Sequence, residues 1–210
     1  GFDRSLISAY GHDDRVCAYP SLTALFESDA SEHTLMVVLA DKEEIGSEGN
    51  TGMQCALFTD IMGAITEALG GNIYTVKANS KCLSSDVNAC FDPNFAEVYE
   101  SKNAAKINCG ITMSKYTGSG GKGGTNDAPA EYVAWIRKIF EEYGVVWQTA
   151  ELGKVDAGGG GTVAKYVANQ NISTVDLGVP VLSMHSPFEV VSKIDVYMAY
   201  KAFSTFLKQN

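Results

Sequence analysis

An apolar run that ends in four consecutive charged residues is the part of this sequence with the clearest chemical potential. Residues 35–40 (LMVVLA) are followed by Asp41, Lys42, Glu43 and Glu44 and then by a glycine-broken turn. A buried strand that ends in neighbouring carboxylates places charge at the edge of a sheet, where α/β proteins usually keep their ligands. Two such carboxylates can divide the work, one holding a metal ion and the other moving protons. The alternative interpretation is a solvated loop pair on the surface.

Residue types that bind metals also gather at the ends of three other predicted elements. The three segments are residues 11–15 (GHDDR) before the first predicted helix, 85–88 (SDVN) after a short strand, and 182–186 (LSMHS) after an apolar run. Each has a structural explanation by itself, since Asp13 or Asp86 can cap a helix or a turn. In a parallel sheet, however, the strand ends lie side by side. Ligands that are distant in the sequence can therefore meet in one crevice.

The segments that must position these residues alternate between strand-like and helix-like patterns. Apolar spacing predicts helices over 16–27, 54–69, 127–143 and 192–207, and apolar or β-branched runs predict strands over 34–40, 73–78, 83–87, 107–116, 145–149 and 179–184. Pro20 is expected to mark an early turn or a kink in the first helix. Strands interleaved with helices favour an α/β layered domain with a mostly parallel central sheet. No repeat or linker interrupts the chain, so one domain over residues 1–210 is the economical interpretation.

Composition narrows the class of protein. The chain has 210 residues, 45% apolar content and a net charge of −9. Nucleic acid is not an expected partner, because a phosphate backbone needs clusters of Lys and Arg and the sequence has none. A membrane is not expected either, because no apolar run approaches membrane-spanning length. The five cysteines lack the paired spacing of a disulfide or zinc framework. A reducing compartment, the cytoplasm, is therefore predicted.

Taken in order, the motifs resemble those of the aspartyl aminopeptidase and vacuolar aminopeptidase I family of dinuclear zinc exopeptidases. The resemblance covers nearly the whole chain, and the residues that carry it are Asp13-Asp14, 41–47 (DKEEIGS), 84–95 (SSDVNACFDPNF), 155–162 (VDAGGGGT) and 182–189 (LSMHSPFE). It implies a three-layer α/β/α sandwich of the zinc-exopeptidase kind. It also implies a metallo-aminopeptidase that hydrolyses N-terminal residues from peptides by metal-activated water.

The resemblance further implies a role for each site residue. Asp13 bridges two metal ions, and Asp86 is a ligand of one of them. Glu44 and His185 bind the other ion, and Glu43 is the general base. Oxygen and imidazole ligands suit zinc, manganese or cobalt. A carboxylate that is not itself a ligand can take a proton from water and pass it to the leaving amine.

One histidine ligand of that family has no equivalent here. It belongs to an upstream His-x-Asp motif, whereas His12-x-Asp14 overlaps the bridging-aspartate motif and His33 precedes a predicted strand at the wrong end. The family's proteins are longer, with an N-terminal catalytic segment and an inserted dimerisation domain, so this chain resembles their C-terminal catalytic part. They also form large homo-oligomers built from dimers. A non-catalytic structural or partner-binding protein is thus the alternative to an enzyme.

Two glycine-rich segments, 118–125 (GSGGKGGT) and 157–162 (AGGGGT), raise the alternative of phosphate binding through backbone N–H groups. Neither completes a nucleotide-binding motif, because Lys122 is followed by glycine and Val163 replaces the closing glycine. We expect instead that these loops let backbone approach a peptide substrate, although they could also only turn the chain. The predicted substrate contacts are Lys115, Lys122, Gly159 and Gly160.

Overall fold

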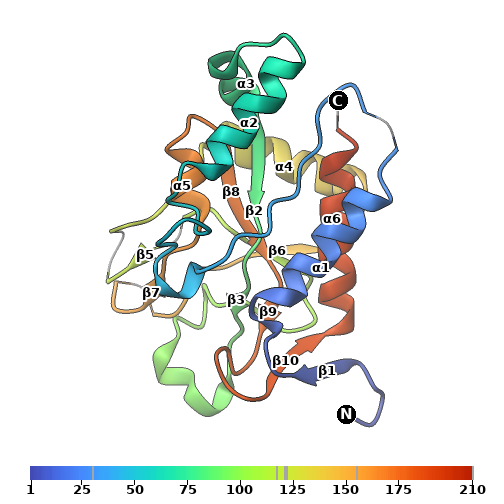
Figure 1. Ribbon diagram of the computed structural model, residues 1–210. Helices are drawn as coiled ribbons and strands as arrows, with labels where there is room; N and C mark the ends of the chain where they lie inside the picture. Colours follow the sequence, from blue (N-terminus) through green and yellow to red (C-terminus); the bar gives the residue numbers. More distant parts are fainter. Residues whose placement is uncertain (30, 117, 121–122, 155, 210) are drawn as a thin grey trace.

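A four-stranded sheet runs through the centre of the molecule (Figure 1). The structure is a computed structural model, which describes residues 1–29, 31–116, 118–120, 123–154 and 156–209. The strands of the sheet lie in the order β2 (Lys81–Ser84), β8 (Ser173–Gly178), β4 (Ile111–Ser114) and β6 (Trp147–Thr149). Strand β2 is parallel to β8, and β4 is parallel to β6, but β4 and β8 are antiparallel. The fold is therefore α/β, and its central sheet is mixed, with two parallel pairings and one antiparallel pairing.

Three pairs of short strands join the loops around this sheet. Strand β1 (Leu6–Ala9) is antiparallel to β10 (Glu189–Ser192), β3 (Asn88–Ala89) is parallel to β9 (Pro180–Val181), and β5 (Gly118–Ser119) is antiparallel to β7 (Gly159–Gly160). In the first pair Ala9 lies opposite Glu189. This register brings the beginning of the chain beside the loop that carries His185.

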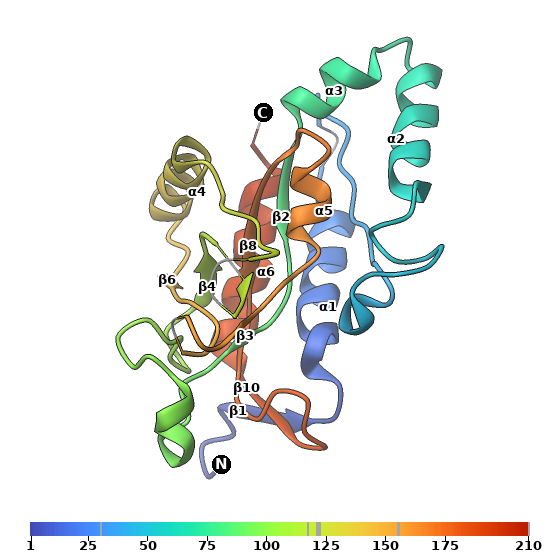
Figure 2. The same cartoon turned by 90° about the vertical axis from the view of Figure 1, so that its left-hand side faces the viewer.

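The helices pack around the sheet and against one another. They are α1 (His12–Phe26), α2 (Leu57–Ala68), α3 (Ile73–Asn79), α4 (Ala130–Glu142), α5 (Ala164–Ala168) and α6 (Lys193–Leu207), with 3-10 turns η1 (Glu43–Ile45) and η2 (Pro93–Val98). Helices α1 and α6 lie side by side, and α4 and α5 both contact β8. Helices α2 and α3 extend away from the sheet (Figure 2). Within the described residues no helix is both long and apolar enough to cross a membrane.

The core forms where the amphipathic faces of the helices meet the sheet. In α4 the buried residues Tyr132, Ile136, Ile139 and Phe140 recur at helical spacing, so one stripe of the helix faces inward. They share one core cluster with apolar residues of β4, β8 and α6. The four helices predicted from apolar spacing correspond to α1, α2, α4 and α6.

The backbone of α1 is irregular at its beginning and not at its proline. Pro20 is buried within the helix, whereas the non-helical backbone angles belong to Asp13 and Asp14. The helix thus continues through Pro20, and the expected turn there is wrong. Because the irregular turn comes first, the carboxylates of Asp13 and Asp14 are displayed by a bent segment and not by a regular helix.

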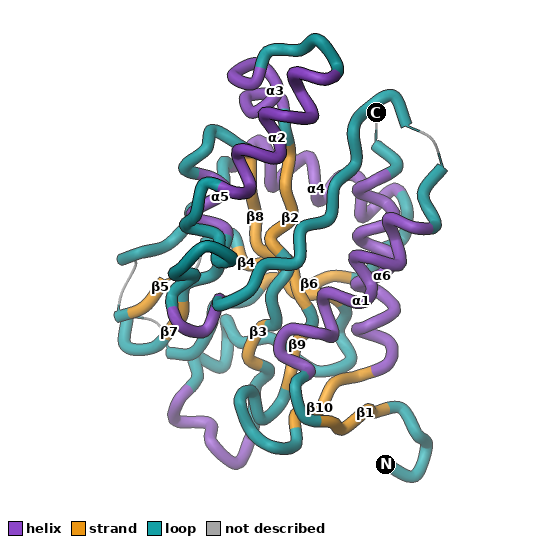
Figure 3. Tube along the Cα trace, in the orientation of Figure 1, coloured by secondary structure: helices purple, strands orange, loops and turns teal. Residues whose placement is uncertain are grey.

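Two predicted strands are absent from the described structure. Residues 34–40 form no strand and run as a loop toward η1 (Figure 3). Val38 and Leu39 there are 47% and 59% exposed. An apolar run becomes a strand only beside another strand that satisfies its backbone groups. Residues 73–78 fall in α3, because Asn72 caps that helix by accepting hydrogen bonds from the N–H groups of Tyr74 and Thr75.

The sequence analysis also missed β8, which lies between β2 and β4. Asp176 interrupts its apolar pattern, yet this residue is only 4% exposed. One carboxylate oxygen accepts a hydrogen bond of 2.5 Å from the hydroxyl of Thr162, and the other has no partner among the described residues. Burial raises the pKa of Asp176 to about 6. The polar residue is therefore held inside the sheet at an energetic cost.

We predict that Asp176→Asn will remove a pH dependence of stability. In the folded chain the carboxyl keeps its proton up to about pH 6, while the unfolded chain loses it near pH 3.8, the ordinary pKa of an aspartate. Its contribution to stability is therefore greatest below that value and is lost as pH rises toward 6. The loss amounts to roughly 3 kcal/mol at about 1.4 kcal/mol per pKa unit. The free energy of unfolding of the wild type and of Asp176→Asn is measured with a denaturant, in the presence of a metal chelator, from about pH 3.5 to 7.5. A difference between them that stays constant with pH would contradict the prediction.

Candidate metal centre

Three side chains of the types that bind metals come from distant parts of the chain and meet at one place. Asp13 comes from the first turn of α1, Glu44 from η1, and His185 from the loop between β9 and β10. The Nε2 atom of His185 lies 2.9 Å from Oδ2 of Asp13 and 3.0 Å from Oε1 of Glu44. One ligand atom of each residue lies within 4.8 Å of the others. An imidazole and two carboxylates at this spacing match the donor set that zinc binds in enzymes.

A second group shares Asp13 with the first. Asp13, Asp14 and Asp86 offer three carboxylate oxygens that lie within 4.8 Å of one another. One oxygen of Asp14 is buried and has no hydrogen-bond partner in the described part of the chain. Asp14 was not a predicted ligand, although its position beside Asp13 in the sequence was the available clue. The two groups share one aspartate, and each has the residue types and spacing that could hold a cation.

Burial and mutual repulsion disfavour the ionised state of these carboxylates. Burial, reinforced by the carboxylate of Glu44, raises the pKa of Asp13 to about 6. Burial is also the main reason that the pKa of Asp14 is raised to about 8 and that the pKa of Asp86 lies well above its usual range. The pKa of Glu43 is raised by burial and then by Glu44. A divalent cation would offset both effects, so the chemistry of the donor set fits a metal.

The turn η1 presents two adjacent glutamates from a sharply bent backbone. Lys42 before it and Gly46 after it both have left-handed conformations, with φ of 64° and 87°. The N–H of Gly46 donates to the carbonyl of Glu43, and the N–H of Ser47 donates to that of Lys42, both at 2.8 Å. Successive residues of such a turn point in different directions. Glu44 contacts His185, and both glutamates line a neighbouring hollow.

The position of Asp86 depends on close contact with a glycine. A Cβ atom added to Gly178, at the end of β8, would lie 1.5 Å from the carbonyl oxygen of Asp86. No residue with a side chain fits there without moving the backbone. Gly178 thus lets the segment of Asp86 pass against the end of β8, next to the segment of Asp13.

A buried glutamate contacts the backbone of two residues of the first group. Glu189, which is 2% exposed, accepts hydrogen bonds from the N–H groups of Asp13 (3.0 Å) and His185 (2.7 Å). The sequence analysis did not single out this residue. Only the pairing of β1 with β10 brings it to Asp13, so the sequence held no local indication of the contact.

A hollow of about 280 Å³ opens beside the two glutamates. Its walls come from η1, from the turn after it, and from the segment at the start of α5: Glu43, Glu44, Gly46, Ser47, Gly161, Thr162, Lys165 and Tyr166. The hydroxyl of Tyr166 donates to the carbonyl of Gly46 at 3.1 Å and ties the two walls together. Lys165 supplies the positive charge of this hollow. Neither Lys165 nor Tyr166 was predicted, because nothing in the local pattern sets them apart.

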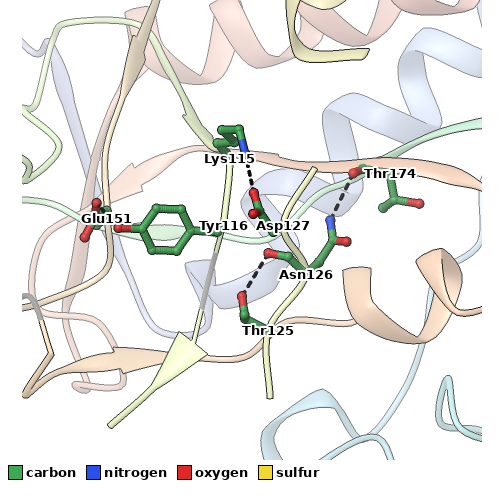
Figure 4. A network of polar contacts seen from close by, with 7 residues as sticks. All are labelled: Lys115, Tyr116, Thr125, Asn126, Asp127, Glu151 and Thr174. Carbon is green, nitrogen blue, oxygen red and sulfur yellow. Dashed lines mark hydrogen bonds and ion pairs between the residues drawn. The ribbon is translucent and has the colours of Figure 1, made fainter. Parts of the chain in front are cut away.

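The predicted substrate contacts lie elsewhere or outside the described residues. Lys115 forms an ion pair with Asp127, within a polar network that spans the segment after β4 (Figure 4). Gly159 and Gly160 form β7 and pair with β5. None of these three lines the hollow beside Glu43. Lys122 lies outside the described residues. As substrate contacts, all four stay predictions.

The two other histidines do not join either ligand group among the described residues. The Nε2 atom of His12 is buried without a hydrogen-bond partner in this part of the chain. His33 is exposed in the loop that follows α1. The second group therefore consists of carboxylates alone.

An α/β fold with two ligand groups that share an aspartate is the arrangement typical of hydrolases that use paired metal ions. A family model described as aminopeptidase I zinc metalloprotease (M18) matches residues 1–207. The chain therefore belongs to the M18 family, whose description names zinc as its metal.

Individual relatives agree with this membership. A probable M18 family aminopeptidase 1 from Clostridium acetobutylicum is 47% identical over 99% of this chain and 45% of its own length. The crystal structure of an M18 aminopeptidase from Thermotoga maritima matches with a TM-score of 0.96 at 44% identity, covering 100% of this chain and 48% of the other. A structure of the mApe1 dodecamer from Saccharomyces cerevisiae matches with a TM-score of 0.84 at 30% identity, covering 100% and 47%. This chain spans about half the length of the curated relatives it matches.

We predict unequal metal binding at the two groups. The group of Asp13, Glu44 and His185 contains an imidazole and should bind zinc more tightly than the all-carboxylate group, whose oxygens form a harder and weaker site for zinc. His185→Ala should lower zinc affinity by at least about 10-fold, while the exposed His33→Ala, a matched control, should leave it unchanged. Competition with a chromophoric chelator measures both. Two equally tight zinc ions per isolated chain would contradict the prediction.

Proposed function

We propose that this chain is the catalytic part, over residues 1–210, of a metallo-aminopeptidase that hydrolyses N-terminal residues from peptides. The observation that carries the proposal is the meeting of Asp13, Glu44 and His185 within 4.8 Å, in a chain of the M18 family. The proposed cofactor is zinc, with two ions in the complete site and manganese or cobalt as substitutes. Asp13 is the shared ligand, Glu44 and His185 complete one position, and Asp86 belongs to the other.

The proposed mechanism gives the two adjacent glutamates different roles, with Glu44 as a metal ligand and Glu43 as the general base. Zinc, when bound, acts as a Lewis acid on the scissile carbonyl and makes water a nucleophile near neutral pH. Glu43 takes the proton of the attacking water and delivers it to the leaving amine. This role is supported by its place beside Glu44 in the wall of the hollow and by its raised pKa, which burial causes and Glu44 reinforces. A base with a pKa nearer the working pH is a better proton carrier.

The hollow beside Glu43 is the proposed place of the substrate's N-terminal end. It opens directly next to Glu43 and Glu44, so a peptide there has its first peptide bond near both side chains. Lys165 offers a cation to a carbonyl oxygen or a carboxylate. The glycine-rich segments around Gly159 and Lys115 remain proposed contacts for the rest of the peptide, because backbone without side chains permits close approach.

A second function is favoured by one specific observation. Among the described residues only one of three histidines joins a ligand group, and the second group has no imidazole. A chain with this site alone would serve as a non-catalytic structural or partner-binding protein. The retention of Glu43, which is outside both ligand groups, favours the enzyme, because a carboxylate beside the ligands has no evident structural task.

The assembly and surroundings of the chain are also proposals. A homo-oligomer is supported by the yeast relative whose structure is described as a dodecamer. A cytoplasmic location is supported by five cysteines that are all free thiols in the structure. Helices on both faces of the central sheet would give the three-layer α/β/α sandwich of a zinc exopeptidase. The proposed partners are peptides, and neither nucleic acid nor membrane.

An assay of anilide hydrolysis tests the proposal. The 210-residue chain and a longer natural chain that contains it are loaded with zinc and given leucine- and aspartate-anilides. Hydrolysis that requires zinc and stops with a chelator is the expected result for the longer chain. Hydrolysis by the shorter chain as well would reject the non-catalytic alternative. If neither zinc-loaded chain hydrolyses either substrate, the proposed aminopeptidase function is wrong.

We predict that Glu43→Gln and Glu44→Gln will fail in different ways in the active form. Glu43→Gln should keep its metal but lose about 10²–10⁴-fold in rate, because a general base is removed. Glu44→Gln should lose metal affinity, because a neutral amide is a poorer ligand than a carboxylate. Excess zinc should then partly restore Glu44→Gln alone. Rescue of Glu43→Gln by metal would show that the two roles are reversed.

A further inference from the structure

Glu189 differs from the other carboxylates at the site in what it contacts. It is 2% exposed, and each of its oxygens accepts one backbone hydrogen bond, Oε2 from Asp13 and Oε1 from His185. It belongs to neither ligand group. Hydrogen bonds from N–H groups to an ionised carboxylate are among the stronger ones in proteins. Its two oxygens are thus engaged by backbone and not by a metal position.

The two residues that Glu189 contacts come from opposite ends of the chain. Asp13 follows β1, and His185 precedes β10, the strand on which Glu189 lies. The β1–β10 pair ends with Ala9 opposite Glu189, so both loops leave the sheet at the same place. Beyond that point the Glu189 carboxylate links the two loops by one hydrogen bond to the backbone of each. It therefore sets the separation of the two backbones that carry Asp13 and His185.

The backbone of His185 needs such a restraint. His185 has φ of 65° and Ser183 has φ of 57°, both in the left-handed region that residues with side chains rarely adopt. Conformations of this kind persist only where surrounding contacts enforce them. The hydrogen bond of 2.7 Å from the N–H of His185 to Glu189 ties this loop to the first residue of β10.

We propose that Glu189 is a positioning residue that holds the Asp13 and His185 ligands at metal-binding separation before a metal arrives. The inference rests on the proposed function, since it concerns the same site. Preorganised ligands bind more tightly because less conformational freedom is lost on binding. The chemistry of Glu189 is confined to accepting two backbone hydrogen bonds.

A second carboxylate in the chain provides a matched control. Asp195, which is 0% exposed, accepts hydrogen bonds of 2.7 Å from the N–H groups of Asn108 and Gly110. Those two residues also have left-handed backbones, with φ of 69° and 90°. Asp195 and its partners belong to neither ligand group. We therefore expect the loss of Asp195 to remove two backbone hydrogen bonds, as the loss of Glu189 does, but to leave the ligands in place.

The test compares Glu189→Gln with Asp195→Asn in the full-length protein. The zinc dissociation constant is measured by chelator competition, and the unfolding temperature is measured without metal. Both variants should lower the unfolding temperature, but only Glu189→Gln should weaken zinc binding, by about 10–100-fold. Equal zinc affinity in Glu189→Gln and wild type would overturn the inference, as would an equal loss in Asp195→Asn. A wild-type protein that binds no zinc would instead overturn the proposed function itself.

A measurement on the wild-type protein covers the case in which Glu189→Gln does not fold. Amide hydrogen exchange of Asp13 and His185 is followed in the metal-free protein. Both amides should exchange much more slowly than in an unstructured peptide, because Glu189 accepts their hydrogen bonds before metal binds. Exchange at unstructured-peptide rates, with protection only after zinc is added, would show that the metal and not Glu189 orders the loops.

Discussion

Carboxylates that are partly buried and close to one another are the constraint on which the rest of this structure depends. Burial raises the pKa of Asp13 to about 6 and that of Asp14 to about 8. It also raises the pKa of Asp86 well above its usual range. Groups that repel one another in a place of low polarity do not assemble by their own attraction. Something else in the fold must hold them together until a cation offsets their charge.

Backbone contacts supply that restraint. The left-handed residues on both sides of η1 bend the chain so that Glu43 and Glu44 stand on one turn. Gly178 lets the segment of Asp86 lie against the end of β8, where any side chain would collide. Glu189 links the backbones of Asp13 and His185. Each of these three contacts restrains the main chain, so the side chains of the ligands remain available for a metal and a substrate.

How far the sequence predicts the elements depends on how local their causes are. The amphipathic stripe of α4 is a property of its own residues, and this helix was predicted. The run at 34–40 has the composition of a strand, but no strand pairs with it in the described structure, so it remains a loop with Val38 and Leu39 exposed. Strand β8 was missed for the opposite reason, since buried Asp176 breaks its apolar pattern although two strands flank it.

The sequence by itself determined the chemical types at the site and their order along the chain, because a carboxylate or an imidazole keeps its chemistry wherever it lies. The motifs that they form resemble those of the family to which the chain belongs. Only the tertiary structure decided the mixed sheet, the meeting of Asp14 with Asp13 and Asp86, and the wall that Lys165 forms beside Glu43. The physical reason is distance. Contacts between residues far apart in the chain depend on strand pairing and close backbone approach, which no short stretch of sequence contains.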